Sequence, residues 1–151
     1  MNIIIHGSTG HMGRAVAQIA AQSEAFTTAA FISPEYEDPQ PPCYSRIEDY
    51  SGPADCIIDF SNHKAAAQLT AYAAGRGIPI VIATTGHDSG EIALIHECAK
   101  KVPVFYAANL SLGVAVLAKL AKQAAAFFPD ADIEIVETHH NRKLDAPSGT
   151  A

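Results

Sequence analysis

The chain has 151 residues, of which 48% are hydrophobic and 17% charged, and its formal net charge is −6 at neutral pH. This length allows one well-packed core, with one domain or slightly more, and the composition excludes an intrinsically disordered chain. The acidic balance argues against a nucleic-acid binder, because such proteins need clustered lysines and arginines to cover the phosphates.

Two further classes are disfavoured by the arrangement of the apolar residues and the cysteines. The apolar runs are short and interrupted, so no membrane span is expected, and the N-terminus reads as a strand rather than a signal peptide. The three cysteines, Cys43, Cys56 and Cys98, are far apart and form no C-x-x-C motif. This pattern fits reduced thiols in a cytoplasmic protein better than a disulfide framework or a zinc knot.

Short strand-like runs alternate with longer runs of helical spacing up to residue 107. The predicted strands are 2–6, 26–32, 56–60, 79–83 and 102–107; the predicted helices are 12–22, a helix capped by Ser61, and 89–101. Residues 33–43 contain four prolines and are expected to form a loop. This alternation predicts an α/β fold with a doubly wound parallel sheet, since a (β/α)₈ barrel would need roughly 250 residues.

The pattern changes after Asn109. Residues 114–128 are predicted to form an alanine-rich amphipathic helix closed by Pro129, and residues 132–138 alternate with the period of a strand that has one polar face. We therefore expect one domain at 1–109 and, at 110–151, the beginning of a second, α+β domain that is incomplete in this sequence.

Three glycines, Gly7, Gly10 and Gly13, lie between the first predicted strand and the first predicted helix. A dinucleotide-binding loop needs glycine for its tight turn, for close approach of the backbone to the pyrophosphate and for helix–strand packing. The pyrophosphate then binds the free N–H groups at the helix N-terminus. The spacing G-x-x-G-x-x-G is one residue longer than the common motif, and a purely structural turn is the alternative.

The second strand ends without the acidic residue that normally binds the adenosine ribose. Ser33, Pro34 and Glu35 stand at this place, and no lysine or arginine lies near to bind a 2′-phosphate. Glu35 could take the acidic role. The choice between NADH and NADPH stays open, with a slight preference for NADH.

Small polar residues follow three successive strands, at 60–62, 84–86 and 107–111. Ligands of such sheets bind beyond the carboxyl ends of the strands, and small side chains would let a flat nicotinamide ring approach the backbone. Any one cluster taken alone is better explained by helix caps and turns, but three clusters at three successive strand ends together favour a ligand site.

The segment 137–151 carries most of the predicted chemistry. If 139–143 forms a helical turn, Lys143 shares a face with His139 and His140, an arrangement suited to proton donation and carboxylate binding. Pro147 can begin another helix, whose free N–H groups at 148–150 and the Thr150 hydroxyl would bind a carboxylate. A substrate with more than one carboxylate is expected. The alternatives are a metal bound by the histidine pair, which lacks a third ligand nearby, and a solvated basic loop.

The sequence resembles the 4-hydroxy-tetrahydrodipicolinate reductase family over nearly its whole length. The resemblance is carried, in order, by Gly7-x-x-Gly10-x-Met12-Gly13, Ile58–Ser61, Ala83–Gly86, Ala108–Val114 and Glu137–Ala151. It implies a Rossmann-type dinucleotide-binding domain at 1–109, and at 110–151 the start of a substrate domain that builds a homotetramer through a mixed open sheet. It also implies a substantially longer whole protein.

The resemblance further implies roles for individual residues. His139 is the expected proton donor with Lys143 as its partner, and His140, Gly149 and Thr150 are the expected ligands of the substrate carboxylates. The expected cofactor-binding residues are Gly7, Gly10, His11, Met12, Gly13, Ser33, Phe60, Thr84, Thr85, Gly86, Ala108, Asn109 and Leu110. No metal is expected.

Three departures from the family's pattern involve four positions. His11 replaces a frequent arginine, Ser33 and Pro34 replace the acid–base pair that often binds the adenosine ribose, and Leu110 replaces a frequent aromatic residue. The first two departures put the cofactor preference in doubt.

The activity implied by the resemblance is the NADH- or NADPH-dependent reduction of 4-hydroxy-tetrahydrodipicolinate, a cyclic dicarboxylate, to tetrahydrodipicolinate in lysine and diaminopimelate biosynthesis. The alternatives are another nicotinamide oxidoreductase of the same architecture, acting on a sugar or an amino acid, and a nucleotide-binding module without turnover. No nucleic-acid or membrane partner is expected.

Overall fold

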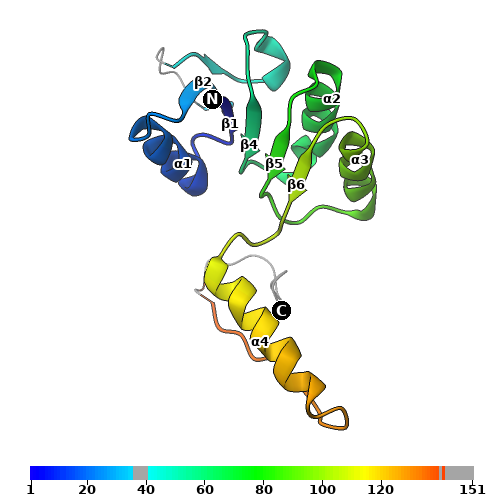
Figure 1. Cartoon of the computed structure of the whole chain (residues 1–151). Coiled ribbons are helices and arrows are strands. Elements are labelled where there is room, and N and C mark those ends of the chain that lie inside the picture. The colour runs from blue at the N-terminus through cyan, green and yellow to red at the C-terminus, as the bar shows by residue number, and fades with distance from the viewer. Residues whose placement is uncertain (36–40, 140, 142–151) are drawn as a thin grey trace. The chain divides into compact units, whose positions relative to one another are not determined.

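A computed structural model describes residues 1–35, 41–139 and 141. The chain forms two compact units, Met1–Ala107 and Ala108–Ala151 (Figure 1). Across the described ranges, no helix is both long and apolar enough to cross a membrane.

The first unit is built on a parallel sheet, which has six strands among the described residues, in the order β3-β2-β1-β4-β5-β6. The strands are β1 (Asn2–His6), β2 (Thr27–Ile32), β3 (Cys43–Tyr44), β4 (Cys56–Asp59), β5 (Ile80–Ile82) and β6 (Val104–Tyr106). The order reverses between β1 and β4, so the predicted doubly wound, Rossmann-type sheet is confirmed.

Helices cover both faces of this sheet (Figure 1). The first unit contains α1 (His11–Ala21), α2 (Ala66–Arg76) and α3 (Ser89–Ala99), with short 3₁₀ turns η1 (Ile47–Asp49) and η2 (His63–Ala65); the second unit contains α4 (Leu112–Ala126). The predicted helices agree with these within a few residues.

Alternation along β1 divides the core into two layers. Ile3 and Ile5 point toward α1 and pack with Phe31 and Ala20. Ile4 points to the opposite face, where the buried side chains come from the sheet and from α2 and α3, including Ile57, Leu69, Ile80 and Ile95. A strand buried on both faces needs apolar residues at every position, which explains the continuous isoleucine run. Each large side chain buried in this way contributes about 1.5–3 kcal/mol.

Two local predictions in the first unit were wrong. β3 begins at Cys43, the last residue of the segment predicted to be a loop, and ends at Tyr44, where no strand is predicted. It pairs with Phe31 and Ile32 of β2; the prolines before it fit this edge position, where fewer ladder hydrogen bonds are needed. The N-cap of the helical segment after β4 is Asn62, whose side chain accepts from the Lys64 N–H at 3.0 Å, instead of Ser61. The Ser61 hydroxyl donates to Asp59 at 2.6 Å and is therefore already engaged.

The second unit departs from its prediction in the strand expected at 132–138. Its described residues form no strand there, and Ile133, Ile135 and Val136 are exposed. A strand requires a hydrogen-bonded neighbour, and no described residue of this unit supplies one.

α4 begins two residues before the predicted start at 114, because the Ser111 hydroxyl accepts from the Val114 N–H at 3.4 Å and caps the helix earlier.

The guanidinium of Arg76, at the end of α2, fixes the backbone that leads into β4. It donates to the carbonyl oxygens of Tyr50, Ser51 and Gly52 at 3.0, 3.2 and 2.7 Å. The Tyr72 hydroxyl donates to the same Tyr50 carbonyl at 2.6 Å. One side chain thus satisfies three loop carbonyls and holds the loop against α2.

Replacing Arg76 by alanine should lower the free energy of unfolding by about 1–2 kcal/mol, because three carbonyls lose a charged donor at a partly solvated site. Urea denaturation monitored by circular dichroism would measure the change. The control is Arg46→Ala: Arg46 lies 3.7 Å from Glu48 in an exposed pair, and its loss should cost less than about 0.5 kcal/mol. Equal losses in the two variants would contradict the role given to Arg76.

Candidate functional site

A cleft of about 390 Å³ lies in the first unit, at the loops that follow β1, β4 and β5. This is the switch point of the strand order, where doubly wound sheets bind their ligands. The cleft is lined by His11, Met12, Phe60, Ser61, Asn62, His63, Ala83, Thr84 and Thr85.

The glycine loop packs against neighbouring backbone so closely that side chains are excluded. Gly7 has φ +79°, and a Cβ on it would lie 2.6 Å from the carbonyl oxygen of Phe60. A Cβ on Gly13 would lie 2.1 Å from the carbonyl oxygen of Gly7. The start of α1 is therefore held directly against the loop and the end of β4.

The N-terminus of α1 offers backbone donors without a competing side chain. Its N-cap is Gly10, no side chain caps it, and its first turn contains no acidic residue. Beside it, Ser8 is 3% exposed, and its hydroxyl oxygen has no hydrogen-bond partner within the described structure. Free N–H groups and the helix dipole favour an anion at this position.

A buried carboxylate, that of Asp59, organises the floor beneath the cleft. His6 Nδ1 lies 2.7 Å from Asp59 Oδ1, and the Ser61 hydroxyl donates to the same oxygen at 2.6 Å. The Thr84 hydroxyl donates to the other oxygen, Oδ2, at 2.7 Å. The ends of β1, β4 and β5 are thereby tied to one side chain that is 1% exposed.

These contacts also set the protonation of Asp59. Burial acts to raise its pKa, but the hydrogen bonds from His6, Ser61 and Thr84 together lower it more, so the pKa of Asp59 lies below its ordinary value. The carboxylate is therefore ionised at neutral pH and accepts hydrogen bonds from its neighbours.

At the end of β2 the structure places a neutral pair of hydroxyls. Thr9 Oγ1 and Ser33 Oγ are 2.7 Å apart, and the Ser33 N–H donates to the Tyr44 carbonyl at 3.0 Å. Ser33 is buried. The position where many dinucleotide-binding proteins carry an acidic residue is thus occupied by an uncharged side chain fixed by the glycine loop and β3.

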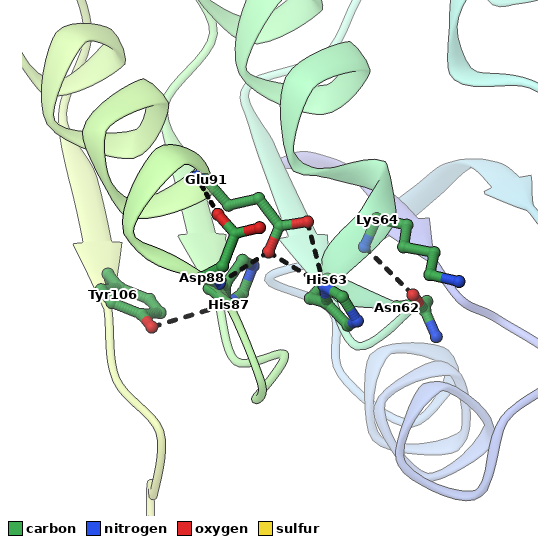
Figure 2. A network of polar contacts seen from close by, with 7 residues as sticks. All are labelled: Asn62, His63, Lys64, His87, Asp88, Glu91 and Tyr106. Carbon is green, nitrogen blue, oxygen red and sulfur yellow. Dashed lines mark hydrogen bonds and ion pairs between the residues drawn. The ribbon is translucent and has the colours of Figure 1, made fainter.

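A second polar network borders the cleft between β4 and the start of α3 (Figure 2). His63 Nδ1 lies 2.9 Å from both carboxylate oxygens of Glu91. Glu91 also accepts from the Asp88 N–H at 2.9 Å, while Asp88 accepts from the Glu91 N–H at 2.8 Å, which makes a capping box. Next to it, His87 Nδ1 and the Tyr106 hydroxyl are 3.4 Å apart.

Most of the predicted cofactor residues meet at this cleft. His11, Met12, Phe60, Thr84 and Thr85 line it. Gly7, Gly10 and Gly13 form the loop that begins α1, and Gly86 has φ +86° in the turn after β5. Ala108, Asn109 and Leu110 belong to the second unit.

Of the residues predicted to act on a substrate, His139 alone lies within the described ranges. Its side chain is exposed, and its Nδ1 is 3.5 Å from a carboxylate oxygen of Glu137. The other four, His140, Lys143, Gly149 and Thr150, lie outside the described residues.

Sequence reasoning missed Asp59 with His6, and His63 with Glu91. The first pair left a signal, because a carboxylate and an imidazole each end an otherwise apolar strand, and the two residues lie opposite each other in the parallel register. The second pair left none, because its members are 28 residues apart and meet only through the fold.

Comparison with known families covers almost the whole chain. Residues 1–110 match the family described as "Dihydrodipicolinate reductase, N-terminus". Residues 113–151 match the family described as "Dihydrodipicolinate reductase, C-terminus".

Individual relatives agree with these family matches. The chain is 45% identical to a 4-hydroxy-tetrahydrodipicolinate reductase of Caldanaerobacter subterraneus subsp. tengcongensis over 100% of this chain and 60% of the relative. It is 42% identical to one of Campylobacter lari, over 100% of this chain and 59% of the relative. The chain therefore spans about three fifths of the length of these curated relatives.

Two solved structures are similar to this one. A dipicolinate-bound dihydrodipicolinate reductase from a Paenisporosarcina species has a TM-score of 0.77 and 26% identity, and the match covers 99% of this chain and 62% of the other. A myo-inositol 2-dehydrogenase from Lactobacillus plantarum has a TM-score of 0.63 at 14% identity, over 82% of this chain and 41% of the other. The second likeness shows the fold alone.

Replacing Asp59 by asparagine should destabilise the first unit by about 2 kcal/mol at neutral pH, because the hydrogen-bond donors His6, Ser61 and Thr84 then lose their charged acceptor. Because the pKa of Asp59 is lower in the folded state than in the unfolded state, its carboxylate stabilises the protein fully above the unfolded-state pKa, near about pH 4. This stabilisation is lost as the pH falls through the folded-state pKa. The difference in unfolding free energy between wild type and Asp59→Asn should therefore shrink below about pH 4.

Urea denaturation over a pH series measures this difference. The matched control is Asp49→Asn, because Asp49 is an exposed aspartate in η1, and its replacement should change stability by less than about 0.5 kcal/mol. A difference for Asp59→Asn that stays constant with pH would contradict the ionised, hydrogen-bonded role of Asp59.

Proposed function

The chain belongs to the dihydrodipicolinate reductase family, and from this premise we propose that the whole protein reduces 4-hydroxy-tetrahydrodipicolinate to tetrahydrodipicolinate with NADH or NADPH, in lysine and diaminopimelate biosynthesis. The observation that carries the proposal is the identity of 45% to a reductase of that name along the entire chain. The cleft at the switch point supports it, because nicotinamide dinucleotides bind there in sheets of this topology.

The described residues of the cleft fit a dinucleotide. Gly7 and Gly13 leave no room for a Cβ, so the loop and the start of α1 pack directly against each other and against the end of β4. The free amides at the start of α1 would bind the pyrophosphate, and the unpartnered hydroxyl of Ser8 adds a polar atom in the same loop. When bound, NADH or NADPH supplies the hydride at its nicotinamide ring.

Of the two cofactors, we propose that NADH is preferred. The sequence contains no lysine or arginine from residue 15 to residue 45, a range that includes the end of β2. The neutral Thr9–Ser33 pair can bind a ribose hydroxyl but offers no charge to a 2′-phosphate.

For the substrate, we propose that His139 delivers the proton that accompanies hydride transfer, with Lys143 as its partner. His140, Gly149 and Thr150 would bind the carboxylates of the cyclic dicarboxylate. The motif that contains all five supports these roles, and so does the similar reductase whose structure holds dipicolinate, a planar dicarboxylate.

We further propose that the whole protein is a cytoplasmic homotetramer. Apolar residues of α4 support the assembly, since Leu117 and Leu120 are 67% and 56% exposed, and exposed apolar residues on one element are typical of interfaces. The three cysteines, none of which forms a disulfide in the structure, support the reducing compartment.

A fluorescence titration with NADH and with NADPH, each with and without pyridine-2,6-dicarboxylate, tests the function. We expect cofactor binding that is tighter for NADH and that strengthens when the dicarboxylate is present. In the control variant Gly13→Ala, the added Cβ would lie 2.1 Å from the Gly7 carbonyl oxygen, so cofactor affinity should fall at least about tenfold, or about 1.4 kcal/mol. If the folded wild-type chain binds neither cofactor, the proposal is wrong. In the whole protein, cofactor binding that ignores the dicarboxylate would favour a different nicotinamide oxidoreductase.

Replacing His139 by glutamine should lower turnover by about 10²-fold or more, which is the usual contribution of a positioned proton donor. Cofactor affinity should stay unchanged, because the role proposed for His139 is proton delivery and not cofactor binding. Steady-state oxidation of NADH in the presence of substrate measures the first effect, and the titration above measures the second. Turnover that survives within about threefold, under roughly 0.7 kcal/mol of barrier, would rule out the proton-donor role.

A further inference from the structure

His63 is a cleft residue to which the proposed function gives no role. It lies in η2, directly after β4, and it is one of the residues that line the cleft. Its side chain is 32% exposed, and the Glu91 carboxylate that it contacts is 16% exposed. The pair is therefore partly shielded from water but open on the cleft side.

Glu91 is held rigidly and carries a charge. Its carboxylate accepts from the Asp88 N–H in the capping box of α3, and it contacts His63 at the same time. The backbone hydrogen bond from Asp88, with a smaller contribution from His63, keeps the pKa of Glu91 below its ordinary value. An ionised carboxylate can only accept hydrogen bonds. When the His63 imidazole is neutral, its single N–H must therefore be on Nδ1, the nitrogen that faces Glu91.

The other ring nitrogen, Nε2, then presents a lone pair. Figure 2 shows His63 with Nδ1 toward Glu91 and the remaining ring nitrogen on the opposite side of the ring. No described residue makes a hydrogen bond to this nitrogen. The nearest aromatic neighbour, His87, has its ring centroid 6.4 Å away, and its own Nδ1 faces Tyr106 at 3.4 Å. A carboxylate thus orients the imidazole and fixes its tautomer, and it leaves an acceptor on a ring that lines the cleft.

The topology indicates which part of a dinucleotide this acceptor would meet. With the pyrophosphate at the N-terminus of α1, the adenosine half extends toward the end of β2, on one side of the switch point. The nicotinamide half must then extend to the other side, over β4 and β5. His63 follows β4, and Glu91 lies in the helix that follows β5.

We propose that His63, oriented by Glu91, binds the nicotinamide half of the cofactor, with Nε2 accepting a hydrogen bond from a ribose hydroxyl or from the carboxamide N–H₂. This inference rests on the proposed function, because it takes the cleft to bind a nicotinamide dinucleotide. His63 is a binding residue in this account, and Glu91 is a positioning residue that acts through it.

The test measures the affinity of the full chain for NADH, ADP-ribose and ADP by isothermal titration. His63→Ala should weaken NADH binding about fivefold, the value of one hydrogen bond, and leave ADP binding unchanged, because ADP lacks the whole nicotinamide half. If the ribose hydroxyl is the donor, ADP-ribose weakens as NADH does; if the carboxamide is the donor, ADP-ribose is unaffected. The matched control is His96→Ala, an exposed histidine of α3 outside the cleft, which should change no affinity.

A double-mutant cycle tests the role of Glu91. Glu91→Gln keeps a side chain able to form the capping box, but its amide can also donate to Nδ1 and so permit the other tautomer. It should weaken NADH binding about threefold in the wild-type background and have no effect in the His63→Ala background. Nitrogen NMR of the imidazole should show Nδ1–H in the wild type, with a shift of Nε2 on addition of NADH.

The failure of this inference can be told apart from the failure of the proposed function. If the folded wild-type chain binds neither NADH nor NADPH, the proposed function and the inference fall together. If the wild type binds NADH and His63→Ala binds it equally well, or if ADP affinity falls as much as NADH affinity, only the role of His63 is overturned. An Nε2–H tautomer in the wild-type spectrum would also overturn it.

Discussion

The buried carboxylate of Asp59 is the interaction on which the cleft depends. An anion removed from water is costly unless several donors surround it, and here the donors come from the ends of β1, β4 and β5. The same requirement that stabilises the carboxylate therefore fixes the relative positions of the three strand ends. Thr84 serves two functions, since it donates to Asp59 and also lines the cleft above it. The floor of the cleft is thus set by the core and needs no ligand to form it.

Above this floor, the proposed binding of a dinucleotide relies on backbone more than on side chains. The glycine loop meets Phe60 and the first turn of α1 at distances that exclude any Cβ, and the free amides of that turn are the proposed donors. Backbone donors bind a pyrophosphate without distinguishing one dinucleotide from another. Selectivity must come from side chains farther out, and two pairs are proposed to supply it: Thr9 with Ser33 on the adenosine side, and His63 with Glu91 on the other.

The sequence predicted those features that depend on neighbours along the chain. The isoleucine run gave β1 its correct bounds, and the small polar clusters predicted at 60–62 and 84–86 contain five of the nine residues that line the cleft. Predictions failed where a distant partner decides the outcome. Ser61 is engaged by Asp59 and leaves the cap to Asn62, β3 exists because β2 lies beside it, and residues 132–138 lack a described neighbouring strand. His63 and Glu91 could not be paired from sequence, because nothing local links them.

The double use of Glu91 joins two properties of the protein that are usually separate. One carboxylate closes the first turn of α3 and also holds an imidazole at the edge of the cleft. When the first turn of α3 frays, Glu91 no longer holds the imidazole in place. Conversely, a ligand that fixes the imidazole opposes fraying of the turn, because two coupled equilibria affect each other by the same free energy. Amide hydrogen exchange in the first turn of α3 thereby becomes a reporter of what occupies the cleft, although the turn itself touches no ligand.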